Sequence, residues 1–210
     1  MVAAQVRRLA GIGLLGAFLL LACGGSRPGS PPGVLPAVPT PTPVSTGPTL
    51  LAALGDVISR VRPVLLDPAL ETAGSVDLSL GGRLNENGSW VLGFAYSNLQ
   101  RRQTVRYSSA GTLVYDPSTT ALNPPLLVES GAILDSDRVA RLALDADLQA
   151  CINANPKRTG WHLSMYVYNR GDGAFNIVTL IDSTKEPIDS VFVSETTGTV
   201  LPLTPRCVTQ

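Results

Sequence analysis

Hydrophobic residues recur along the chain with two different periods. Over Leu50–Val61 they follow the three-and-four spacing of one helical face, which predicts an amphipathic helix. Residues 75–84 and 90–96 instead alternate apolar and polar positions, as half-buried strands do. Residues 85–88 between them are Asn-Glu-Asn-Gly, and Asn-Gly supplies the positive φ angles that a tight reversal needs. The pattern predicts a helix followed by a β-hairpin.

A similar order of patterns returns in the second half of the chain. Thr104–Val114 is a third apolar run, broken at Ala110-Gly111, and Val139–Ile152 has the spacing of a second amphipathic helix, with Asp135 and Asp137 as capping side chains. Three strand candidates follow this helix, at residues 161–168, 175–181 and 188–200.

The two halves match at a nearly constant offset. Leu163 follows Leu78 by 163 − 78 = 85 residues, and Gly198 follows Gly111 by 198 − 111 = 87 residues. We therefore predict an α+β protein of two tandem helix-plus-three-strand units, at 49–122 and 133–210, with the helices packed on antiparallel sheets. A single α+β domain without duplication is the alternative, and it predicts the same packing of helices on sheet.

The N-terminal residues have the features of an export signal. Arg7 and Arg8 precede an apolar run, Leu9–Ala22, whose 14 residues are too few to span a bilayer as a helix. The run ends in Leu-Leu-Ala-Cys-Gly, which resembles the lipobox of bacterial lipoproteins. That resemblance implies a signal peptide at 1–22 and a lipidated Cys23 as the first residue of the mature chain, whose acyl chains attach it to the membrane. The alternative is an ordinary signal peptide whose cleavage site happens to contain Cys.

Proline dominates the segment that follows. Residues 23–48 contain eight of the 17 prolines, with Gly, Ser, Thr and Val and a single charge. Such a composition cannot form a packed core and favours extended geometry. The segment is expected to be a semi-rigid tether between the lipid and the globular part.

Composition excludes several classes of function. The chain has 16 Lys plus Arg against 16 Asp plus Glu, so it lacks the basic excess of a nucleic-acid binder. Its only histidine, His162, excludes any site that needs two, and no catalytic motif is present. We therefore expect no enzyme, no cofactor, no metal site and no catalytic residues. A hydrolase with a non-standard site is the least favoured class.

Two groups of residues are candidates for specific interactions. Lipidation of Cys23 would leave Cys151 and Cys207, an even number that suggests a disulfide in an exported chain, although two unpaired thiols remain the alternative. Arg101, Arg102 and Arg106 form the one basic cluster. They could protect an edge strand from aggregation, or they could bind an anionic envelope polymer or an acidic partner.

The second half also resembles the PepSY domain family, small modules in which a helix precedes three strands and the last strand closes on a Thr-Gly pair. The residues that carry this resemblance are Asp135-Ser136-Asp137, Ala143, Phe175–Val178 and Val193–Val200. The resemblance covers about 75 residues. It implies a binding or inhibitory module of the kind found in protease propeptides and envelope proteins, and it transfers no binding residues.

These observations lead to one functional hypothesis and one alternative. The first is a lipid-anchored extracytoplasmic module of the cell envelope, attached to the membrane through its N-terminal lipid, that binds another envelope or secreted protein and modulates a secreted protease. The alternative is a structural or assembly lipoprotein that docks onto another envelope protein through an open sheet edge.

Overall fold

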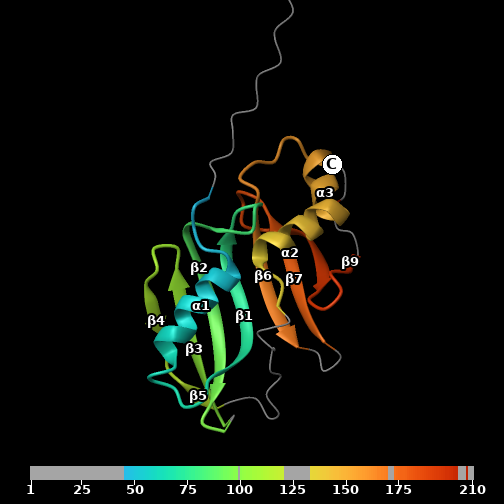
Figure 1. The fold of residues 1–210 in the computed structure, drawn as a ribbon. Helices are drawn as coiled ribbons and strands as arrows, with labels where there is room; N and C mark the ends of the chain where they lie inside the picture. Colours follow the sequence, from blue (N-terminus) through green and yellow to red (C-terminus); the bar gives the residue numbers. More distant parts are fainter. Residues whose placement is uncertain (1–44, 99, 121–132, 170–172, 203–206, 208–210) are drawn as a thin grey trace, which may run out of the picture. The chain divides into compact units, whose positions relative to one another are not determined.

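One antiparallel sheet contains all nine strands of the residues that the structure, a computed structural model, describes (Figure 1). These residues are 45–98, 100–120, 133–169, 173–202 and 207. The predicted signal peptide, Cys23 and most of the predicted tether lie outside them. None of the helices in the described ranges is long and apolar enough to cross a membrane.

The elements follow one another in a simple order. The first helix, α1, spans Leu50–Val61, and a second helical stretch consists of α2 (Ser136–Ala143), the π-helical turn η2 (Leu144–Leu148) and α3 (Gln149–Ala154). The strands are β1 (Ala69–Leu78), β2 (Leu84–Tyr96), β3 (Arg101–Ser108), β4 (Leu113–Tyr115), β5 (Thr119–Thr120), β6 (His162–Asn169), β7 (Ala174–Ile181), β8 (Pro187–Ser194) and β9 (Val200–Pro202).

The lateral order of the strands is β4-β3-β2-β1-β6-β7-β8-β9, with β5 also pairing with β3. Neighbours in sequence pair as antiparallel hairpins on both sides of the sheet. The central contact is different, because β1 pairs with β6, which lies more than eighty residues later in the chain. Both edge strands, β4 and β9, contain only three residues.

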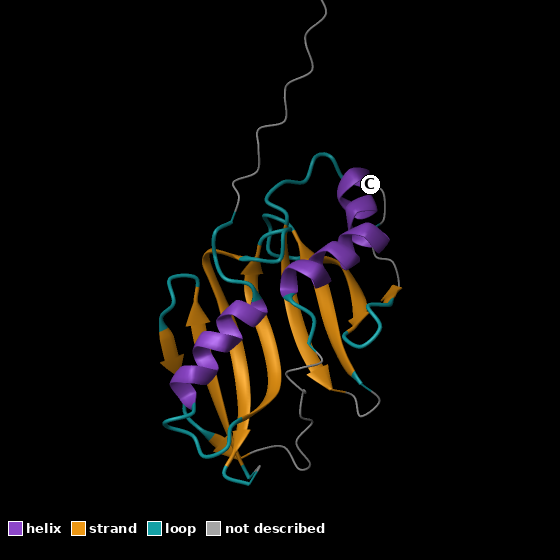
Figure 2. Ribbon diagram, viewed as in Figure 1, coloured by secondary structure: helices purple, strands orange, loops and turns teal. Residues whose placement is uncertain are grey.

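Both helical stretches lie on the same side of the sheet (Figure 2). The apolar face of α1 contributes Leu50, Leu54 and Val57 to the core, and the second stretch contributes Val139 and Leu148. Along β7 and β8 every second residue is buried toward these helices, as the period-two alternation predicts. A single hydrophobic cluster therefore joins both helical stretches to strands from each half of the sheet.

Of the two predicted capping residues of the second helix, Asp135 is the N-cap, whereas Asp137 lies inside the first turn of α2. The carboxylate of Asp135 accepts a hydrogen bond from the Ser136 backbone N–H, as an N-cap residue does. The same carboxylate accepts bonds from the Thr49 hydroxyl and the Leu51 backbone N–H, at 2.8 and 3.0 Å. Asp135 therefore links the start of α1 to the start of α2 through hydrogen bonds.

The prediction of two tandem helix-plus-three-strand units is wrong. The range expected for the first unit contains α1 to β5 and the second contains α2 to β9, but their strands form one continuous sheet instead of two. Pairing of β1 with β6 joins them. In two separate three-stranded sheets, β1 and β6 would each be an edge strand with one side unpaired. In one sheet, the backbone groups on those sides pair with each other.

The predicted hairpin turn is also displaced. The reversal between β1 and β2 occurs at residues 79–83, where Gly82 has φ +73°, and Asn87-Gly88 lies inside β2. Gly88 has a different role there, since a Cβ atom on it would lie 2.4 Å from the Asp77 carbonyl oxygen. Its lack of a side chain permits the close approach of two backbones.

Candidate functional site

A row of mostly apolar residues crosses the face of the sheet that the helices do not cover. The strand register places one residue of each main strand directly beside the next, from one edge of the sheet to the other. In order from β4 to β9 the row is Val114, Arg106, Val91, Gly74, Tyr166, Ile177, Phe192 and Leu201. We call these eight residues the transverse row.

The transverse row is accessible. Val114, Tyr166 and Leu201 are 52%, 45% and 53% exposed, and Val91, Ile177 and Phe192 are half-buried among their neighbours. The outer face of a sheet with one solvated side normally carries polar residues, so a row in which six of the eight residues have large apolar side chains is unusual. Exposed apolar patches of this kind mark interaction surfaces.

Neutral polar residues flank the transverse row. They lie both on the β6–β8 side and on the β1–β3 side of the seam, the line along which β1 pairs with β6. Ser164, Thr179 and Ser190 lie side by side on β6, β7 and β8, and Thr179 and Ser190 share a hydrogen bond of 3.0 Å between their hydroxyls. Thr72 on β1 and Thr104 on β3 flank the row on its other side, where both are paired with Gly93 of β2. The surface thus offers hydroxyl groups beside apolar ones.

The seam between β1 and β6 is hollowed. The register between these strands is regular at Gly74 and Tyr166 but shifts before Leu78 meets Leu163. In the irregular stretch the Met165 backbone N–H donates to the Ser75 hydroxyl at 2.8 Å instead of to a carbonyl group. Because Gly74 has no side chain, a hollow of about 420 Å³ forms here, lined by Thr72, Gly74, Ser75, Val91, Arg102, Thr104, Ser164, Met165 and Tyr166.

A second hollow, of about 840 Å³, continues along the same seam. It shares Ser75 and Ser164 with the first hollow and adds Val76, which is exposed, and Trp161. His162, the lone histidine, also lines it, with Nδ1 3.0 Å from the Gly160 carbonyl oxygen. The two hollows together form a depression along the middle of the open face.

The three arginines of the predicted basic cluster all lie on β3, but they do not act as one patch. Arg101 and Arg102 are consecutive strand residues and point to opposite faces; Arg101 donates to the Ser118 hydroxyl at 2.9 Å. Arg102 forms an ion pair with the buried carboxylate of Glu71 at 3.0 Å, and Arg106 pairs with Asp116 at 3.2 Å. Carboxylates therefore face two of the three charges, and β3 is covered by β4 and β5 rather than lying at an edge.

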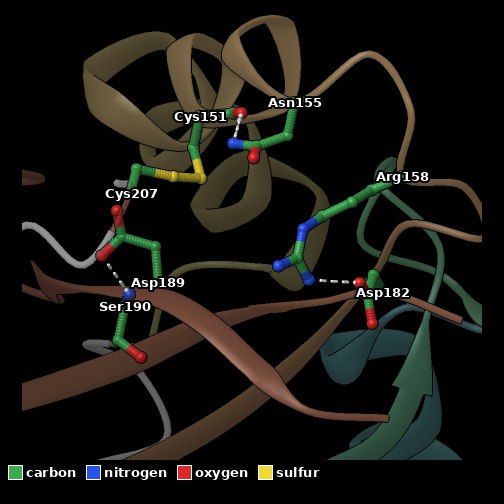
Figure 3. The surroundings of a disulfide bond; sticks show 7 residues. All are labelled: Cys151, Asn155, Arg158, Asp182, Asp189, Ser190 and Cys207. Carbon is green, nitrogen blue, oxygen red and sulfur yellow. Dashed lines mark hydrogen bonds and ion pairs between the residues drawn. A yellow bond between two sulfur atoms is a disulfide. The ribbon is translucent and has the colours of Figure 1, made fainter. Parts of the chain in front are cut away.

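The structure brings Cys151 and Cys207 together as a disulfide, with Cα atoms 5.6 Å apart. Cys151 lies on α3 and is buried, while Cys207 follows β9 and is half-buried (Figure 3). Cys23, the predicted lipidation site, lies outside the described residues.

Sequence reasoning missed a buried polar pair on the helix side of the sheet. Glu195, directly after β8, accepts hydrogen bonds from the Asn176 side-chain amide and the Leu134 backbone N–H. Burial raises the pKa of Glu195 to about 7, against the opposing effect of these two donors. The available signal was the alternation of β8, because residue 195 has the same parity as the inward-facing Val191 and Val193.

Comparison with protein-family models, with curated proteins and with solved structures gives no match for this chain. The lipobox and PepSY resemblances stay predictions.

Proposed function

We propose that the protein is a lipid-anchored extracytoplasmic binding module, without catalytic activity of its own, that holds another envelope or secreted protein against the open face of its sheet. The transverse row is the single observation that carries this proposal. It presents Val, Tyr, Ile, Phe and Leu side chains on a face that lies opposite the helices.

The chemistry of the open face points to a partner recognised by apolar contact. The charged member of the row, Arg106, is already paired with Asp116, and the flanking residues are mainly Ser and Thr. Protein interfaces combine such an apolar centre, in which aromatic residues are enriched, with a hydrogen-bonding rim. The hollow beside Gly74 gives that centre a recess for one protruding side chain of the partner.

Docking through a sheet edge has weaker support. The edge strands β4 and β9 are three residues long, and β9 ends in Pro202, which has no backbone N–H to donate. Short edges that contain proline are how proteins prevent strand addition. The face therefore offers more binding surface than either edge.

Site-specific photocrosslinking in intact cells tests the proposal. A photoreactive phenylalanine analogue replaces Tyr166 on the open face or, as the control, Leu51 on α1, which is 38% exposed. A third position, Tyr115 on β4, reports on edge docking. We expect one discrete protein adduct from position 166 and none from position 51.

Matched substitutions give the test a second readout. Tyr166→Lys and Leu51→Lys each place a charge at an exposed apolar position. Only the first should abolish co-purification, with the intact lipoprotein, of the partner that crosslinking at position 166 has identified. Adducts at position 115 alone would favour the edge, and equal adducts at 51 and 166 would refute the proposal. If the partner is a secreted protease, the class implied by the PepSY resemblance, its inhibition by the wild-type protein and not by Tyr166→Lys can be measured directly.

A further inference from the structure

Three side chains with metal-binding chemistry meet beneath the end of the second helical stretch. Cys151 comes from α3, Asp189 from β8 and Cys207 from the segment after β9 (Figure 3). Their two sulfur atoms and one carboxylate oxygen all lie within 4.8 Å of one another. Residues distant in sequence thus converge on one point.

Asp189 places a charged side chain at a buried position of the sheet. It occupies an inward position of β8, is 2% exposed, and lies opposite Leu180 on β7. Its Oδ1 accepts a hydrogen bond from the Ser190 backbone N–H at 2.8 Å, whereas its buried Oδ2 has no hydrogen-bond partner among the described residues. A buried carboxylate oxygen without a partner is costly, so it calls for an explanation.

No neighbouring cation neutralises this carboxylate in the described part of the chain. Arg158 lies in the same region, but its guanidinium is paired with Asp182 at 2.7 Å (Figure 3). The Asp189 carboxylate faces the sulfur atoms instead. A cation held between the sulfurs and this oxygen would satisfy it.

We infer that reduction of the Cys151–Cys207 disulfide creates a three-ligand site for a thiophilic divalent cation such as Zn²⁺, with Asp189 as the third ligand. Zn²⁺ binds Cys thiolates and Asp carboxylates, and water can fill its fourth position. The Cα separation of 5.6 Å suits a disulfide. It equally allows two thiolates to move to about 3.8 Å apart, the spacing that tetrahedral Zn–S bonds require.

Conversion of the disulfide into the metal site requires a reductant and releases protons. A dithiol reductant supplies two electrons and two protons, the Cys151–Cys207 bond breaks, and the reductant becomes a disulfide. On binding the cation, the two thiols release their protons, so that two thiolates and the Asp189 carboxylate face a charge of +2. The disulfide and the bound metal would thus be alternative crosslinks between Cys207 and α3.

Cadmium titration of the full chain tests this inference. Cys23→Ser is introduced so that Cys151 and Cys207 are the only thiols, and the protein is reduced with a phosphine. Cd²⁺ binding is followed by the ultraviolet thiolate-to-cadmium charge-transfer band, and Zn²⁺ competition gives the affinity for zinc. We expect one Cd²⁺ per reduced chain and none per oxidised chain.

Asp189→Asn measures the contribution of the carboxylate to metal affinity. It should weaken Cd²⁺ and Zn²⁺ binding at least tenfold, whereas Asp145→Asn, at an exposed position in the same helical stretch, should leave the affinity unchanged. Far-UV circular dichroism reports whether the reduced chain keeps its fold. Absence of binding, or equal affinity with and without the Asp189 carboxylate, as an unfolded dithiol chain would give, would overturn the inference.

Discussion

The side-chain amide of Asn176 donates a hydrogen bond to the carboxylate of Glu195, and both residues are almost wholly buried. The other oxygen of Glu195 accepts from the Leu134 backbone N–H, just before the helix that begins at Ser136. The carboxyl group therefore joins β7 to the start of α2. Asn176 Oδ1 is itself buried without a hydrogen-bond partner in the described residues.

This arrangement predicts that stability falls as the pH rises. Burial raises the pKa of Glu195 to about 7, so the folded state binds the proton more tightly than the unfolded state does. The resulting stabilisation is complete below the unfolded pKa, near 4.3, and is lost as the pH rises to about 7. The loss is on the order of 3 kcal/mol, since one pKa unit corresponds to about 1.4 kcal/mol. Urea unfolding at a series of pH values from 4 to 8 measures it.

Glu195→Gln provides the matched variant. Its amide can donate to Asn176 Oδ1 after that side chain flips, while its oxygen still accepts from Leu134, so it mimics the protonated acid. We expect the variant to be more stable than wild type at pH 8 and to have lost this component of the pH dependence. A wild-type stability that is flat or rising between pH 5 and 7 would contradict the assignment.

The ion pair between Arg102 and Glu71 gives a second prediction. Glu71 is 1% exposed, so removing its cation in Arg102→Met leaves a buried charge unpaired. We expect a loss of about 2 to 3 kcal/mol, below the range for fully buried pairs because Arg102 is partly solvated. Adding Glu71→Gln should recover more than half of that loss.

Arg106→Met is the control for this pair. Arg106 bonds to Asp116 at the same kind of strand position but is more than half exposed, so its removal should cost less than about 1 kcal/mol. Equal losses in the Arg102 and Arg106 variants would show that burial of Glu71 is not what matters. Chemical unfolding at pH 7 distinguishes these outcomes.

Periodicity along the chain located the helices and the inward residues of most strands, although Val76, which alternates with the buried Leu78, is exposed because the register shifts between them. It could not locate neighbours across the sheet. The apolar spacing of Leu50–Val61 predicted α1 with its correct limits, because one helix buries one stripe. Nothing in that spacing says that Gly74 lies beside Tyr166, since lateral neighbours depend on register and on which edges must be covered.

The candidate site could not be predicted from the sequence either, because it also depends on the register between strands. Tyr166, Ile177 and Phe192 are outward residues of three separate strands, and they form a row only when the register of those strands is known. Asp189 could have been noticed, because it shares the inward parity of Val191 and Val193. Its proximity to Cys151 could not, because a helix and a strand meet there through tertiary packing.

The lipobox leads to a prediction about the N-terminus. Cys23→Ser removes the thiol that lipidation requires, so the variant should no longer be attached through acyl chains. We expect it to lose metabolic labelling with a fatty acid and to move from the detergent phase to the aqueous phase on Triton X-114 partitioning. Ser26→Ala, three residues along, is the control and should behave as wild type. Unchanged labelling of the Cys23→Ser protein would refute the lipoprotein assignment.

The disulfide between α3 and the chain end predicts a large effect of its removal on folding. Cys151 and Cys207 are 56 positions apart, and closing a loop of that length lowers the entropy of the unfolded chain enough to stabilise the fold by about 4 kcal/mol. Cys151→Ser and Cys207→Ser should therefore lower the free energy of unfolding by similar amounts under metal-free, oxidising conditions, and the double variant by little more than either alone. Addition of a phosphine should bring the wild type down to the level of the variants and leave the variants unchanged. If the wild type instead proves insensitive to the phosphine and equal to the double variant, the two thiols are not bonded in the folded protein, and the C-terminal segment is held by packing alone.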